Sequence, residues 1–130
     1  MDVKNRILFA TCRKPANMVI LNADDGKILA TLPIGNQSDG AGFNPKTMEA
    51  FSSQGDGTLT IVKEKSPTSF EVEQTLQTMS GARTSALDTK TGHILLVGAE
   101  FGPPATPAEP GRPARPQMVP DSFTILMVGK

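Results

Sequence analysis

Three segments of the chain resemble one another at intervals of 42 and 44 residues, and this internal repeat constrains the fold more than any other feature. Each segment joins a short polar turn to an apolar stretch. The segments begin with Asp2-Val3-Lys4-Asn5, Asn44-Pro45-Lys46-Thr47 and Asp88-Thr89-Lys90-Thr91. Later in the units, Met18-Val19-Ile20 corresponds to Leu59-Thr60-Ile61 and to Phe123-Thr124-Ile125. A period of this length indicates one supersecondary unit that is copied along the chain.

Within each unit, apolar residues recur at every second position over short stretches, which is typical of β-strands. Ile7 and Phe9 alternate in this way. Asp25-Gly26 and Asp56-Gly57 indicate hairpin turns, because glycine tolerates the positive φ that such turns require. No segment has the pattern of a long amphipathic helix. The pattern predicts ten strands, at residues 6–12, 18–22, 27–33, 41–44, 48–53, 59–64, 70–75, 84–88, 93–99 and 122–129.

Four strands in roughly 40 to 45 residues make up one blade of a β-propeller. We therefore expect an all-β propeller fragment of about three four-stranded antiparallel blades, over residues 1–35, 36–79 and 80–130. The first blade is expected to lack its inner strand and the last its outer strand, and Phe9, Phe51 and Leu96 are expected at equivalent positions. The uncovered faces of the terminal blades predict a homo-oligomer, with a dimer favoured. The alternative is that the chain is a piece of a longer propeller.

Composition argues against several classes of partner. The 13 basic and 13 acidic residues balance, whereas nucleic-acid binders usually carry excess positive charge. One cysteine and one histidine supply neither an internal disulfide nor the ligands of a structural zinc site. The apolar stretches are far shorter than the about 20 residues that span a bilayer. We expect no nucleic-acid partner, no membrane partner, no metal and no cofactor.

The units resemble the C-terminal blades of bacterial YVTN-repeat, YncE-like β-propellers. The matching segments are LFATCR at 8–13, DGKILATLPIG at 25–35, GDGTLT at 55–60, GART at 81–84 and SFTIL at 122–126. The resemblance implies a propeller fold of typically seven blades and, in many members, export, although the chain as given begins without a visible signal peptide. We expect a non-enzymatic binding or structural scaffold of this type. The alternative is part of a propeller enzyme, a lactonase-like hydrolase or a quinone-dependent oxidoreductase, with its site at the channel mouth.

Polar residues precede the inner strands of two successive units, where a propeller has the mouth of its channel. The offset of 44 residues places Asp39 and Arg83 at the same blade position, and Thr84 follows. These three residues are the candidate binding site for a small polar or anionic ligand, which Arg83 would bind. The alternative, which we favour, is that they bridge adjacent blades by hydrogen bonds.

Other polar residues have structural interpretations. Gly55-Asp56-Gly57 is expected to be a hairpin turn rather than part of a calcium site, since the alternating ligands of a calcium loop are missing. Cys12 and His93 are not expected to form a catalytic pair, because the repeat position of His93 is filled by Met48 and Arg6 in the other units. The sequence therefore predicts no catalytic residue and no metal ligand.

An insertion at residues 101–121 holds seven of the 11 prolines. Five of them recur at every third position from Pro104 to Pro116, which favours a polyproline II helix with all five along one edge. Arg112 and Arg115 share a second edge and are the candidate partner-binding residues of this loop. The favoured interpretation is a stiff loop folded over the blade or a neighbouring subunit. A disordered loop is the third alternative.

Overall fold

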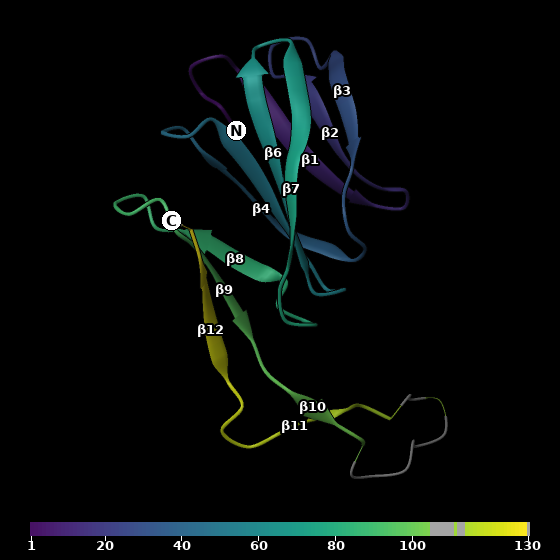
Figure 1. The fold of residues 1–130 in the computed structure, drawn as a ribbon. Helices are drawn as coiled ribbons and strands as arrows, with labels where there is room; N and C mark the ends of the chain where they lie inside the picture. The colour runs from purple at the N-terminus through teal and green to yellow at the C-terminus, as the bar shows by residue number, and fades with distance from the viewer. Residues whose placement is uncertain (105–110, 112–113, 130) are drawn as a thin grey trace.

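The computed structural model describes residues 1–104, 111 and 114–129, and these residues form β-strands without a helix (Figure 1). Every pair of neighbouring strands is antiparallel. The described residues accordingly contain no helix that is long and apolar enough to cross a membrane. The expected all-β class is confirmed.

Three main sheets follow one another along the chain. The first contains β1 (Ile7–Arg13), β2 (Ala16–Asn22) and β3 (Ile28–Pro33) in that order. The second contains β4 (Ser38–Asn44), β5 (Glu49–Gln54), β6 (Thr58–Ser66) and β7 (Ser69–Gln77). The third has β9 (Ile94–Gly98) at its centre, between β8 (Thr84–Leu87) and β12 (Thr124–Val128). Sheets of three, four and three strands agree with the strand count that the repeat predicts.

The insertion contains regular structure that the sequence pattern does not indicate. β10 (Phe101–Gly102) pairs with β11 (Gln117–Met118), and the two form a short ribbon that leads away from the third sheet (Figure 1). β4 also begins three residues before the predicted start at residue 41, because Ser38 pairs with Gln54 across an irregularity in the register. Short pairings and bulges of this kind leave little periodic signal in a sequence.

The three repeated turns share one side-chain hydrogen bond and a positive φ at the same position. The side chains of Asp2, Asn44 and Asp88 each accept a hydrogen bond from the amide of the residue two positions later, which defines an Asx turn. Four residues after these positions, φ is positive at Arg6, Met48 and Gly92.

Gly92 is therefore the counterpart of Arg6 and Met48, and the expectation that His93 fills that position is wrong by one residue. The turn also lowers the pKa of Asp88, chiefly because the Thr91 hydroxyl donates a hydrogen bond to its carboxylate.

The middle sheet is buried on both faces, since its successive residues pack against different neighbours. Ala50 and Val62 belong to a core cluster with Ile7, Met18 and Ile20 of the first sheet. A second cluster fills the other interface and contains Phe51, Leu59, Ile61, Ala82, Ile94 and Leu96. The alternation of side chains along a strand thus assigns neighbouring residues to opposite cores.

Phe51 fills the second of these interfaces, where it lies over Gly42 of the neighbouring strand. The two residues pair across β4 and β5, and a Cβ atom at Gly42 would stand only 2.2 Å from the Phe51 ring. In the third sheet, Ala86 stands at the position of Gly42 and pairs with Leu95. The counterpart of Phe51 is therefore Leu95, and the expected equivalence with Leu96 is wrong by one residue.

We predict that Phe51→Ala lowers the free energy of unfolding by about 3 kcal/mol, because it leaves a cavity between two sheets. Urea denaturation followed by circular dichroism measures the change. Phe101→Ala is the control, since this ring is 62% exposed and its loss is expected to cost less than about 0.5 kcal/mol. Equal losses for the two variants would contradict the assignment of Phe51 to the core.

Candidate functional site

Asp39 of β4 lies between two arginines, one at the end of β1 and the other directly before β8. Arg13 at the end of β1 donates through Nη2 to Asp39 Oδ1 at 2.8 Å and through Nε to the Ser38 carbonyl at 2.8 Å. Arg83 places Nε 3.8 Å from Asp39 Oδ2. We call this group the Arg13–Asp39–Arg83 cluster. It connects equivalent ends of the three sheets through one carboxylate.

The backbone before β4 and β8 explains why Asp39 and Arg83 meet. Gln37 and Gly81, which are 44 residues apart, both have positive φ. The next residue in each turn, Ser38 or Ala82, is buried. The following side chain therefore points outward at the same place in both sheets, as the repeat predicts.

A layer of short polar side chains lies beside the cluster. Ser53 Oγ of β5 donates to the Arg83 carbonyl and is 3.0 Å from Ser85 Oγ. Ser38 Oγ is 3.0 Å from Ser52 Oγ. The second and third sheets are thus joined by hydrogen bonds at this end, whereas apolar side chains join them further along the strands.

The cluster has an unbalanced charge that a small anion could neutralise. Two guanidinium groups face one carboxylate, which leaves one formal positive charge, and both arginine side chains are more than half exposed. Arginine donors suit carboxylate or phosphate oxygens. The same groups also bridge adjacent sheets, which is the interpretation that the sequence favoured.

The structure brings together only some of the residues that the sequence analysis predicts to bind a ligand or partner. Asp39 and Arg83 come together as expected, but Thr84 is exposed and has no hydrogen bond to either of them in the described part of the chain. Arg13 was not predicted. Arg115 is exposed, and Arg112 lies outside the described residues, so the partner-binding loop stays a prediction.

The residues given structural interpretations behave as turn and strand residues. The Asp56 carboxylate accepts hydrogen bonds from Thr58 and from the Asn36 amide, as expected for a turn residue. Cys12 lies in β1 of the first sheet, whereas His93 directly precedes β9 of the third. The described residues contain no group of three or more His, Cys, Asp or Glu side chains arranged to hold a metal ion.

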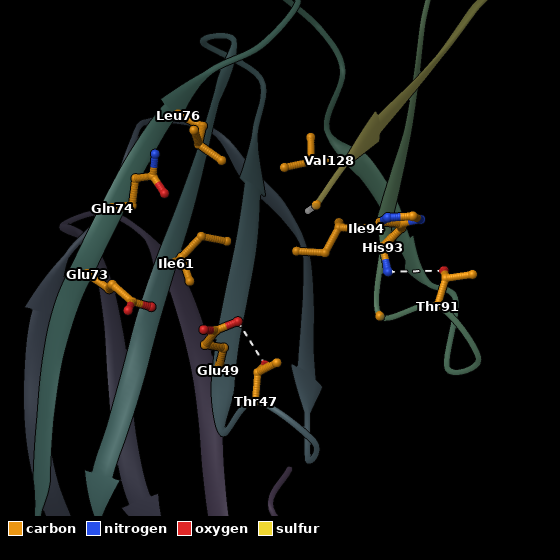
Figure 2. Close-up of a pocket in the computed structure, with 12 residues that line it drawn as sticks. Thr47, Glu49, Ile61, Glu73, Gln74, Leu76, Thr91, His93, Ile94 and Val128 are labelled. Carbon is orange, nitrogen blue, oxygen red and sulfur yellow. Dashed lines mark hydrogen bonds between the residues drawn. The ribbon is translucent and has the colours of Figure 1, made fainter.

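A groove of about 630 Å³ lies between the second and third sheets (Figure 2). Its apolar wall consists of Ile61 and Leu76 on one side and Ile94 and Val128 on the other. Its remaining lining is polar and comprises Thr47, Glu49, Glu73, Gln74, Thr91 and His93, with Gly92 and Gly129. Sequence patterns gave no signal for this groove, because it depends on how two sheets diverge.

Two buried carboxyl groups, Asp2 and Glu64, lie on either side of the Asn5 side-chain amide. Asn5 Nδ2 donates to Asp2 Oδ2 at 2.6 Å and to Glu64 Oε1 at 3.1 Å. The other oxygen of Glu64 is buried without a partner among the described residues. Burial, and then the negative charge of Asp2, raise the pKa of Glu64 above its ordinary value of 4.5.

The chain matches no family model, and neither a curated protein nor a solved structure is significantly similar to it. The resemblance to YVTN-repeat propellers therefore stays an expectation that rests on the sequence segments themselves.

We predict that Asp39→Asn lowers the free energy of unfolding by about 0.5–1 kcal/mol at low salt, since exposed ion pairs contribute little each. In about 1 M NaCl the loss should nearly vanish, because salt screens the two arginines from the carboxylate. Urea titrations at the two salt concentrations measure this. Glu73→Gln is the control, because Glu73 has no ion pair among the described residues. A loss for Asp39→Asn that is unchanged by salt would contradict the electrostatic interpretation.

We predict that Glu64→Gln makes stability less dependent on pH. The pKa of Glu64 is higher in the folded than in the unfolded chain, so protonation stabilises the fold. The stabilisation by protonated Glu64 is fully present below the pKa that Glu64 has in the unfolded chain. It is lost as pH rises through the higher pKa that Glu64 has in the folded chain. Wild type should therefore lose stability relative to Glu64→Gln as pH rises from about 4.5. Thermal melts across this range test it, with the exposed Glu71→Gln as control, and a pH-independent difference would refute it.

Proposed function

We propose that the chain is a non-enzymatic binding and structural scaffold of the YVTN-repeat, β-propeller type, in which each main sheet is a blade. The order of contacts supports the proposal. β4 lies against β1 on one side and β8 on the other, and the outer strands β3 and β7 also contact each other. Sheets that meet face to face in chain order correspond to the packing of blades around an axis.

The Arg13–Asp39–Arg83 cluster is the observation that carries this proposal. It gathers Arg13 of β1, Asp39 of β4 and Arg83, which directly precedes β8, at one end of the three sheets, where a propeller has its channel mouth. The surplus guanidinium charge favours a small anionic ligand at this place. The binding role is accordingly assigned to the cluster and the scaffold role to the sheets.

A second copy of the chain is the proposed partner, because the first and third sheets leave opposite and complementary faces uncovered. Leu8 is the counterpart of Ala50 and Ile94, both of which pack against the preceding sheet, yet Leu8 is 40% exposed. Leu95 is the counterpart of Phe51, and beside it Met127 is 67% exposed. Repeating the internal packing once more would place the third sheet of one copy on the first sheet of another.

We predict a homodimer of twice the chain mass, which sedimentation velocity at about 100 μM would detect. Ile125→Lys combined with Met127→Lys should yield a folded monomer, because it places two charges on the apolar face. Thr68→Lys with Ser69→Lys adds the same charge at two exposed positions where the β6–β7 turn enters β7 and should leave the dimer intact. A wild-type protein that is monomeric and stably folded at this concentration would overturn the assembly.

A further inference from the structure

β12 forms one edge of the third sheet. It pairs with β9 along one side, and no strand among the described residues pairs with its other side. In the second sheet, by contrast, β7 lies outside β6 and pairs with it along most of its length. The backbone N–H and C=O groups on the open side of β12 can therefore pair with an added strand.

The groove of about 630 Å³ borders this open edge. Val128 of β12 and Ile94 of β9 face Ile61 and Leu76 of the second sheet across it (Figure 2). The groove thus occupies the space between the open edge and β7. An added strand at β12 would have one face in solvent and the other in this groove.

We propose that the groove binds an extended peptide, which adds to β12 as an antiparallel strand. Antiparallel pairing is expected because every neighbouring pair of described strands is antiparallel. Main-chain hydrogen bonds then provide affinity, and alternate side chains that enter the groove provide selectivity.

The second sheet indicates which side chains the groove accepts. Val62 pairs with Ala50, and Val128 pairs with Ile94 at the equivalent position. In the outer strand β7, Val72 pairs with Val62. Val72 and Phe70 both pack on the core between the first and second sheets. A peptide with apolar residues at two alternate positions would fill the groove in the same way.

Charge specifies one end of the peptide. A strand antiparallel to β12 has its amino end beside Val128, which is the end of the groove that also contains Glu49. Glu73 lines the groove too and has no hydrogen bond or ion pair among the described residues, while Glu49 lies 3.4 Å from Lys63. These two carboxylates favour lysine or arginine near the amino end of the peptide.

This inference does not depend on the proposed function. Self-association would cover Ile125 and Met127 on the outer face of the third sheet, whereas the peptide would use the edge of β12 and the inner face at Val128. The monomeric variant Ile125→Lys with Met127→Lys can therefore be used alongside wild type in every titration.

The probe is a fluorescein-labelled peptide, KKSFTVTQTLQ, which has the sequence of β7 with both glutamates changed to threonine and two lysines added. We expect saturable binding by fluorescence anisotropy, together with slower hydrogen exchange at residues 124–128. Glu73→Lys should weaken binding about fivefold or more. The control Glu71→Lys changes the same charge on the same strand outside the groove and should have little effect.

A second peptide carries two consecutive prolines in place of its central Thr-Gln. One of any two consecutive amides in a strand faces the partner strand, so this peptide should bind at least about tenfold more weakly. Equal binding of the two peptides, or protection from exchange at strands other than β12, would overturn the proposal. Dissociation of a wild-type dimer by the first peptide would also overturn it, since the groove would then belong to a second copy.

Discussion

The burial of the middle sheet on both faces is the constraint on which the rest of the structure depends. Ala50 and Phe51 are neighbours in β5 and are both buried, yet they belong to different cores. Neighbouring residues of a strand point to opposite faces, so both can be buried only when another sheet lies on each face. The first and third sheets are therefore necessary to the second, while each of them has one face that the described residues leave uncovered. Buried apolar side chains are accordingly more numerous in the middle sheet than in either outer sheet.

The second and third sheets are held together by different interactions along their strands. Apolar side chains fill most of the interface. At the end near Asp39, however, β4 and β8 come so close that a Cβ atom at Gly40 would stand 2.6 Å from Ser53 Oγ and Ser85 Oγ. Only glycine and short hydroxyl side chains fit between such backbones. Larger charged groups must then lie outside this layer, where Arg13, Asp39 and Arg83 are found. The narrow spacing of the inner strands is thus the reason why the charged cluster lies at the surface.

The sequence predicts the strands and turns of this fold well, because the same pattern of apolar and turn residues recurs in each unit. The three turns, the sheets of three, four and three strands, and the pairing of Asp39 with Arg83 all follow from the 42- and 44-residue offsets. The expected equivalences with His93 and Leu96 use an offset of 45 from Met48 and Phe51 and are wrong by one residue, since hydrophobicity alone does not identify the residue with positive φ in each turn. Arg13 could not be found in this way, because its counterparts in the other units, Gly55 and Ala99, carry no charge. The groove was missed for a different reason: it depends on the angle between two sheets, which no local pattern encodes.

The third sheet is incomplete in two ways that differ in their physical consequences. Its outer face is apolar, and the burial of such a face is favourable for any complementary apolar surface, because the hydrophobic effect has no direction. Its open edge is selective, since hydrogen bonding to β12 requires an extended backbone in one register and without proline. The carboxylates of Glu49 and Glu73 add a requirement for charge at one end. The proposed affinity for a second copy and the proposed selectivity for a peptide can therefore be altered independently, although both surfaces belong to the same five-residue strand, Thr124–Val128.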